Sequence, residues 1–160
     1  MPKTEELILG EFSRTIDDRF RIALPQELVD PLLAGSTDCV LAKERPGCLS
    51  LWNARSREKL DEAVRLLRSK VRAGKLEGRI EELQLVTRLL STRQRNVQLA
   101  GRSRLLVLEG FREFLEAEAG SDVFVVGAGV CLEIWNPQAW LAYLEARMPD
   151  FRQLFDKLTS

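Results

Sequence analysis

The chain contains no histidine among its 160 residues. A histidine-dependent catalytic triad, a histidine general base and a histidine metal site are therefore excluded. Cysteine is also scarce, because the thiols are limited to Cys39, Cys48 and Cys131, an odd number without the paired spacing of metal ligands. Such residues are typical of buried hydrophobic side chains in a reducing compartment, so we expect free thiols and no bound metal.

Long apolar runs and an excess of either charge are missing as well. No run approaches the roughly 20 residues of a membrane-spanning helix, so no membrane span is predicted. Residues 1–12, MPKTEELILGEF, lack the basic and apolar regions of a secretory signal, which favours a cytoplasmic location. The formal net charge is zero, so only local clusters can indicate an anionic partner. Hydrophobic residues make up 45% of the chain, enough for one domain or for two small halves that share a core.

One short phrase occurs twice, as GCLSLWN at residues 47–53 and as VCLEIWN at residues 130–136. Trp52 and Trp135 are 83 positions apart (135 − 52). Without a gap, the same offset pairs Cys48 with Cys131, Val40 with Val123, Ile16 with Leu99, Arg19 with Arg102, and Arg21 with Arg104. Matches that keep one register over this length predict a tandem duplication.

Each half is predicted to form a β-β-α-β-β unit. Residues 11–16 and 20–25 predict two strands around a polar turn, and RFRIAL at 19–24 alternates with a period of two. This alternation places Arg19 and Arg21 on one face and the apolar side chains on the other. PQELVDPLLAG predicts a short helix with Pro25 in its first turn, and CVLAKE and CLSLW predict two further strands. The second half repeats the order from NVQLAGRSRLLVLE to VCLEIW.

Four segments follow from this duplication: a first repeat at 8–53, a helical linker at 54–92, a second repeat at 93–136 and a C-terminal helix at 137–160. The linker and the C-terminal segment carry apolar residues at helical spacing. The predicted fold class is therefore α+β, with two tandem units about a pseudo-twofold axis and flanking helices.

Three segments together resemble the MraZ family: GEFSRTIDDRFRIALPQEL, the strands that end in CLSLW, and VFVVGAGVCLEIWNPQAW. The resemblance covers about residues 8–146. It implies that each half carries a swapped-hairpin barrel motif of the SpoVT-AbrB type. In that family each repeat has an Asp, a Gly and an Arg in its first hairpin, and the arginines are implicated in DNA binding.

The family's hairpin pattern is only partly present in this chain. Asp17 and Arg21 match it in the first half, where Phe20 replaces the Gly. In the second half Arg104 matches, whereas Ala100 replaces the Asp and Ser103 replaces the Gly. Leu108 stands where the first half has Pro25. Glycine often supplies a positive φ at such turns, so these replacements affect residues that set the turn geometry.

Arginines cluster around both predicted hairpins. Residues 93–104 contain four arginines and no acid, whereas residues 10–21 balance three arginines with three acids. Arginine forms bidentate hydrogen bonds with phosphate and with guanine, which suits DNA positioning and base readout. Solvated strand charge is the competing interpretation. The candidate DNA-binding residues are Arg14, Asp17, Arg19, Arg21, Arg102 and Arg104.

Catalysis is not predicted, because no combination of nucleophile, base and oxyanion donors can be assembled from these motifs. The resemblance implies a sequence-specific, DNA-binding transcriptional regulator of a division and cell-wall gene cluster. It also implies double-stranded promoter DNA as the partner, association with the nucleoid, no cofactor and a homo-oligomeric ring. An apolar C-terminal stripe through Phe151 and Phe155 agrees with such assembly. The alternative is an oligomer-forming relative that has lost DNA recognition, which the replaced Asp and Gly residues favour.

Overall fold

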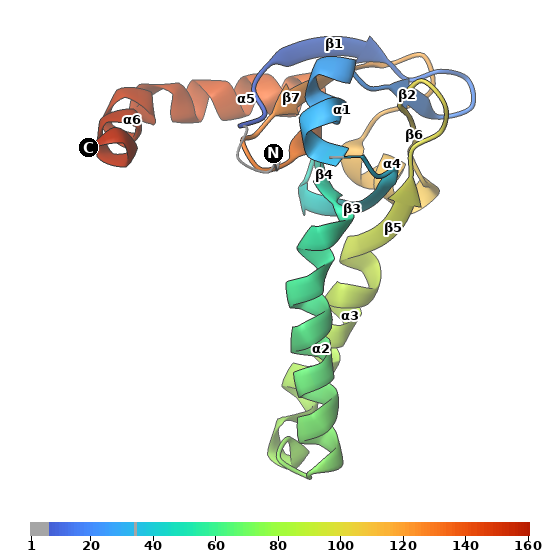
Figure 1. Cartoon of the computed structure of the whole chain (residues 1–160), viewed down its shortest axis with the longest axis vertical. Helices are drawn as coiled ribbons and strands as arrows, with labels where there is room; N and C mark the ends of the chain where they lie inside the picture. The colour runs from blue at the N-terminus through green and yellow to red at the C-terminus, as the bar shows by residue number, and fades with distance from the viewer. Residues whose placement is uncertain (1–6, 34) are drawn as a thin grey trace.

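The computed structural model describes residues 7–33 and 35–160, which form an α+β fold (Figure 1). Residues 1–6, part of the segment interpreted as lacking a secretory signal, lie outside the described residues. The first half comprises β1 (Glu11–Thr15), β2 (Arg21–Ala23), α1 (Gln26–Leu33), β3 (Asp38–Arg45) and β4 (Cys48–Asn53). The second half comprises β5 (Gln94–Gln98), β6 (Arg104–Leu106), α4 (Glu109–Leu115), β7 (Asp122–Gly127) and β8 (Leu132–Trp135). The order β-β-α-β-β is therefore present in both halves.

The offset of 83 residues holds for most of these elements, but it is wrong by one residue at β7. Arg14 of β1 lies opposite Val123, and Val97, the counterpart of Arg14, lies opposite Cys39. Val123 thus corresponds to Cys39 and not to Val40, and both Cys39 and Val123 are buried in the main core. The connection from α4 to β7 (residues 116–121) contains two residues more than the connection from α1 to β3 (residues 34–37), and α4 ends one residue earlier at this offset, so β7 is shifted by one residue.

Six strands form an antiparallel sheet in the order β1-β7-β8-β4-β3-β5, and β2 pairs with β6 in a separate ladder. Strands β4 and β8 meet at the centre of the sheet, with Cys48 opposite Trp135. Strand β1 pairs with β7 and β5 pairs with β3, so each half supplies a strand to the hairpin of the other. Among the described strands this pairing leaves the sheet open, with β1 and β5 at its edges, and does not form a closed barrel.

The main hydrophobic core takes side chains from both halves. Helix α1 contributes Leu28 and Val29, and helix α4 contributes Phe111 and Leu115. The sheet and the β2–β6 ladder contribute Ile22, Leu41, Leu49, Leu51, Leu105, Val123, Val125, Leu132 and Ile134. Each fully buried aliphatic side chain of this kind contributes about 1.5–3 kcal/mol by its removal from water. The two halves consequently share one core.

The repeated tryptophans occupy corresponding places with different surroundings. The indole N–H of Trp52 donates to Ser50 Oγ at 2.8 Å, and that of Trp135 donates to Glu133 Oε1 at 3.0 Å. Trp135 is buried because helix α5 (Pro137–Arg147) packs against it. The ring centroids of Trp135 and of Trp140 in α5 lie 5.0 Å apart. Trp52 is half-buried. The second copy of the motif therefore anchors the C-terminal part of the chain.

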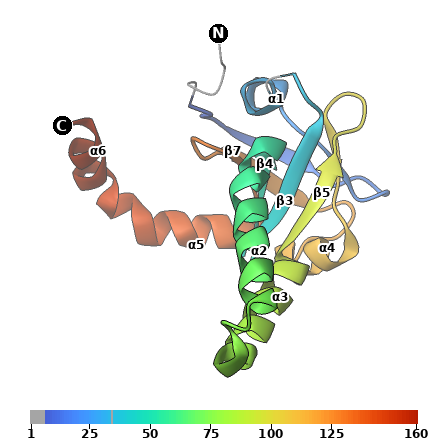
Figure 2. The same cartoon turned by 60° about the horizontal axis from the view of Figure 1, so that its bottom comes forward.

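Two helical segments project from the sheet in different directions. Helices α2 (Arg57–Arg72) and α3 (Ile80–Arg93) run side by side, while α5 and α6 (Phe151–Thr159) leave the body separately (Figures 1 and 2). The predicted single C-terminal helix is wrong in one respect: a 3-10 turn at Met148–Asp150 divides it, because Pro149 has no N–H for a continuous helix. No helix in the described residues combines the length and the apolar character that a membrane crossing requires.

All three cysteines are free and buried, as the sequence predicts. Burial raises the pKa of the Cys39 thiol to about 11 and that of Cys131 to about 12. Burial also raises the pKa of the Cys48 thiol, even further. The thiols therefore act as small core side chains and remain protonated near neutral pH.

Candidate nucleic-acid interface

The two arginine-bearing hairpin turns lie side by side because β2 pairs with β6. In this ladder Arg21 lies opposite Leu106, Ala23 lies opposite Arg104, and Ile22 lies opposite Leu105. Ile22 and Leu105 are 0% and 1% exposed, so this side of the ladder faces the core. Successive side chains of a strand point to opposite faces, so Arg21 and Arg104 share the outer face. The prediction that Arg21 and Ile22 point to opposite faces of their strand is confirmed.

Asp17 organises the first turn. Its Oδ1 accepts hydrogen bonds from the backbone N–H groups of Arg19 and Arg21, both at 2.9 Å. Its Oδ2 accepts from Arg21 Nε at 3.1 Å, which completes an ion pair. The backbone closes the same turn, since Asp17 N donates to Arg21 O at 3.0 Å. Asp17 therefore fixes both the turn and the direction of the Arg21 side chain.

These contacts lower the pKa of the Asp17 carboxyl below its ordinary value of 3.8. The hydrogen bond from the Arg21 backbone N–H is the largest cause, and partial desolvation opposes it. The Arg19 backbone N–H and the Arg21 guanidinium lower the pKa further. The carboxylate is the form that the turn stabilises.

Replacing Asp17 by asparagine is expected to destabilise the protein near pH 7 and to have a decreasing effect in acid. Because the folded-state pKa is lowered, the contribution of the carboxylate is complete above 3.8 and is lost as the pH falls through the folded value. Urea unfolding of the parent and of Asp17→Asn at several pH values measures the difference. Asp18→Asn removes the neighbouring exposed carboxylate and is the control. A difference that is independent of pH would contradict the assignment.

The second turn reaches a similar shape without a carboxylate. Ala100 N donates to Arg104 O at 2.9 Å, which repeats the Asp17–Arg21 backbone contact at the offset of 83. Arg104 Nε donates to the carbonyl oxygen of Gly101 at 3.0 Å. A backbone carbonyl thus takes the place of the Asp17 carboxylate. Although Ala100 replaces the family's Asp, the Arg104 side chain is still hydrogen-bonded within its own turn.

Phe20 and Ser103, which replace the family's glycines, both have a positive φ, 60° and 55° respectively. A non-glycine residue in this left-handed region costs about 1–2 kcal/mol. The hydrogen bonds between the two turns are nevertheless symmetric: Val107 N donates to Phe20 O at 2.8 Å, and Leu24 N donates to Ser103 O at 3.0 Å. Each turn is therefore hydrogen-bonded to the chain of the other half. The turns themselves differ, because Arg102 also has a positive φ, 63°.

The remaining candidate arginines lie around the ladder. Arg14 Nε donates to Ala23 O at 3.0 Å, and its guanidinium lies 5.5 Å from the centre of the Phe12 ring. Arg14 thus reaches from β1 to the backbone of β2 at Ala23, the residue opposite Arg104. Arg19 and Arg102 are exposed at the turns. The structure consequently brings the predicted basic residues of both halves to one region.

Arg93 and Arg95, which belong to the basic segment 93–104, lie away from the ladder, at the end of α3 and on β5. Arg93 Nη2 lies 3.7 Å from Glu44 Oε2, and Arg93 Nε donates to Lys43 O at 3.3 Å. Arg95 is exposed on β5, opposite Leu41 of β3. The four arginines of residues 93–104 are therefore spread from the end of α3 to β6, and only Arg102 and Arg104 lie at the turn.

Leu106 is a residue of this face that the sequence analysis did not identify. It is 50% exposed and lies opposite Arg21, on the outer side of the ladder. An apolar side chain between arginines is suited to contact with the methyl group of thymine. The cross-strand register, which brings Leu106 beside Arg21, depends on pairing between halves and is not visible in a local pattern.

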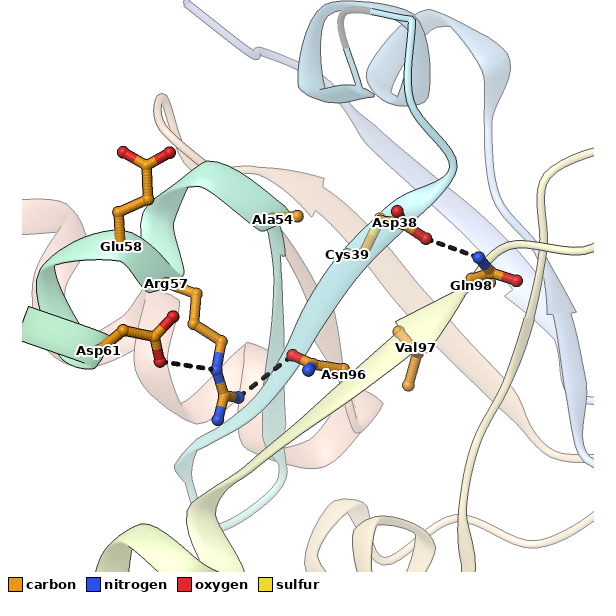
Figure 3. Close-up of a pocket in the computed structure, with 9 residues that line it drawn as sticks. All are labelled: Asp38, Cys39, Ala54, Arg57, Glu58, Asp61, Asn96, Val97 and Gln98. Atoms are coloured by element: carbon orange, nitrogen blue, oxygen red, sulfur yellow. Dashed lines mark hydrogen bonds and ion pairs between the residues drawn. The ribbon is translucent and has the colours of Figure 1, made fainter. Parts of the chain in front are cut away.

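A hollow of about 490 Å³ lies where α2 meets β3 and β5 (Figure 3). Arg57 forms two contacts there: its Nε lies 3.4 Å from Asp61 Oδ1, and its Nη1 donates to Asn96 Oδ1 at 3.1 Å. Gln98 Nε2 donates to Asp38 Oδ1 at 2.7 Å across the β3–β5 pair. The contact from Arg57 to Asn96 connects α2 to the edge strand β5, so we assign this cluster a structural role.

Comparison with known proteins identifies related sequences over most of the chain. Residues 92–158 match the family model described as "MraZ protein, putative antitoxin-like". A protein of Roseiflexus sp. (strain RS-1) named "Transcriptional regulator MraZ" is 30% identical over 145 residues, with 88% of each chain covered. A protein of the same name from Methylobacillus flagellatus is 32% identical over 140 residues, with 87% of each chain covered. One from Heliobacterium modesticaldum is 26% identical over 155 residues, which are 95% of this chain and 96% of that one. On these matches, the chain belongs to the MraZ family.

Proposed function

We propose that this protein is a sequence-specific, DNA-binding transcriptional regulator of a division and cell-wall gene cluster, and that it acts in the cytoplasm at the nucleoid. The observation that carries the proposal is the β2–β6 ladder, with Arg21 and Arg104 on its outer face. Relatives named as transcriptional regulators support DNA as the partner and a role without catalysis.

In this proposal the ladder reads promoter DNA. A two-stranded β-ribbon fits the major groove, where arginine pairs with guanine through two hydrogen bonds. Arg21 and Arg104 project from the ladder and are assigned to base edges, while Arg14, Arg19 and Arg102 are assigned to phosphates. The carboxylate of Asp17 holds Arg21 in a fixed direction, which reduces the side-chain entropy lost on binding.

We also propose the organisation of the chain that supports this function. Each repeat, at residues 8–53 and 93–136, contributes hairpins to a swapped-hairpin arrangement of the SpoVT-AbrB type, with residues 54–92 as the helical linker and 137–160 as the C-terminal segment. The pairing of β1 with β7 and of β2 with β6 supports such an exchange. The two turns form one surface because the exchange brings them together.

A ring of identical subunits is the proposed assembly. Helix α6 exposes Phe151 and Phe155, whose rings stack at 5.4 Å and are 60% and 54% exposed. Apolar side chains in this position are suited to contacts between copies. A neutral chain with few phosphate contacts binds one site weakly, whereas a closed ring presents several ladders and gains avidity of about 10²–10⁴ where the geometry fits.

Light scattering coupled to size exclusion is expected to find a closed oligomer, whose mass does not change with dilution. Changing Phe151 and Phe155 to glutamate should yield smaller species, because it places charge in the apolar contact. Gln153→Glu with Thr159→Glu adds the same charge to polar positions of α6 and is the control. A monomeric parent protein would exclude the ring.

Binding to DNA from upstream of a division and cell-wall gene cluster is the direct test of the proposed function. Fluorescence anisotropy should show tighter binding to this DNA than to a scrambled duplex. The logarithm of the association constant should fall linearly with the logarithm of the salt concentration. The slope of this line should be about −0.9 for each phosphate contact. Equal and negligible binding of both duplexes would instead support the oligomer-forming relative without DNA recognition.

A further inference from the structure

We propose that Arg112 of helix α4 is a positioning residue, which holds the first DNA-binding turn in shape by stacking on Phe20. The inference rests on the proposed function for its effect on DNA, but the stacking itself acts on the free protein. It concerns a residue that is distant in sequence from the turn and that belongs to the other half of the chain.

Phe20 determines the shape of the turn. Its φ of 60° lies in the region that a phenylalanine rarely adopts. Its N–H donates to Asp17 O at 3.0 Å, and its carbonyl oxygen accepts from Val107 N at 2.8 Å. Because Arg19 and Arg21 flank it in the chain, a change of its backbone would redirect both side chains.

The guanidinium of Arg112 covers the ring of Phe20. Its central carbon lies 3.6 Å from the centre of the ring, which is the distance of face-to-face contact. Within the described part of the chain, Arg112 Nε is buried without a hydrogen-bond partner. Contact with the Phe20 ring, and not a hydrogen bond from Nε, therefore accounts for the position of the Arg112 guanidinium.

Four acidic residues line the same hollow of about 650 Å³ as Arg112: Glu109, Glu113, Glu116 and Glu118. None of them forms a salt bridge to Arg112 in residues 7–33 and 35–160. Their charges favour a cation in this hollow and leave the flat face of the guanidinium available for stacking. Helix α4 is itself fixed, because Phe111 and Leu115 are buried in the core.

The second turn has an analogous contact with different chemistry. Ser103 corresponds to Phe20 at the offset of 83, and its hydroxyl donates to Gln26 Oε1 of helix α1 at 3.0 Å. Each residue that replaces a glycine thus contacts the helix of the opposite half. A side chain that reaches a fixed helix stabilises the left-handed backbone that glycine would adopt unaided.

Arg112→Ala is expected to weaken promoter binding by about three- to tenfold, which corresponds to the loss of one partly buried cation–π contact. Its salt dependence should stay at the parent value, because no phosphate contact is removed. Arg88→Ala removes an exposed arginine of α3 and is the control for net charge. Arg112→Lys should fall between parent and alanine, since an ammonium group lacks the planar face.

Phe20→Gly separates positioning from any direct role of Arg112. Glycine adopts the positive φ without the stack, so Phe20→Gly should bind DNA about as well as the parent. Adding Arg112→Ala to Phe20→Gly should then change nothing. The proposal is overturned if Arg112→Ala binds like the parent, if its effect is equally large in the Phe20→Gly protein, or if it lowers the salt slope by about one.

Amide hydrogen exchange of the DNA-free proteins distinguishes this proposal from the proposed function. The Val107 amide, which donates to Phe20 O, should exchange faster in Arg112→Ala and return to a slower rate when Phe20→Gly is added. If the parent protein does not bind DNA, the proposed function fails and this exchange alone decides on the stacking. Unchanged exchange at Val107 in Arg112→Ala would overturn the positioning role even if the parent binds DNA.

Discussion

Truncation of Leu105 to alanine is expected to lower the free energy of unfolding by about 2–5 kcal/mol. Leu105 is 1% exposed and lies directly opposite Ile22, which is fully buried, in the β2–β6 ladder. The truncation removes buried apolar surface and leaves a cavity between the two halves. Urea unfolding followed by tryptophan fluorescence and circular dichroism measures the change.

Leu106 provides a matched control on the same strand. It is the same residue type one position further on, but it is 50% exposed on the outer face. Leu106→Ala should therefore change the free energy of unfolding by only about 0.5 kcal/mol. Equal effects of the two truncations would mean that the ladder does not face the core as described.

The Leu105 variant also tests whether the halves unfold together. The core is built from both halves, since β1 pairs with β7, β5 with β3 and β2 with β6. We expect one cooperative transition that moves as a whole to lower urea concentration. Two transitions, of which Leu105→Ala moves only one, would contradict a shared core.

The repeat offset predicted the elements well because it compares the chain with itself. Once Trp52 is matched to Trp135, the strands and helices of one half indicate those of the other. The comparison was wrong by one residue at Val123, because a gapless offset cannot detect the longer connection before β7. The division of the C-terminal helix has a local signal in Pro149, which the prediction from the apolar stripe did not include.

Strand pairing was less accessible from the sequence than the strands themselves. A period of two assigns Ile22 to a buried face and Arg21 to an outer face whichever strand is the partner. It does not say that the partner of β2 is β6, and this partner determines that Arg21 and Arg104 share a surface. Leu106 and Arg112 were missed for the same reason, since their neighbours are more than 80 positions away in the chain.

The replaced glycines illustrate how tertiary contacts compensate for local preference. Phe20 and Ser103 keep the left-handed conformation although neither residue favours it. Their carbonyl oxygens accept hydrogen bonds from Val107 and Leu24, and their side chains reach α4 and α1. Residues 20 and 103 thus keep a positive φ without glycine, so these two substitutions alone do not argue against DNA recognition.

Replacing Arg21 and Arg104 together by alanine is expected to weaken binding to promoter DNA by about a hundredfold, since each good bidentate contact to a base contributes about 1–3 kcal/mol. The fold should persist. Asp17 Oδ1 still accepts from the backbone N–H groups of Arg19 and Arg21 when the Arg21 side chain is removed. In the described residues, the only hydrogen bond of the Arg104 side chain is the one to Gly101 O in its own turn.

The control for this double substitution is Arg65→Ala with Arg68→Ala, which removes the same charge from exposed positions of α2. Helix α2 projects away from the ladder, so this control should alter binding little (Figure 1). Titrations of promoter and scrambled DNA at several salt concentrations then assign the contacts. Loss of base contacts should reduce the preference for promoter DNA, whereas loss of two phosphate contacts should lower the salt slope by about two units. If the double variant binds both duplexes as the parent does, the ladder does not read DNA and the proposed function is wrong.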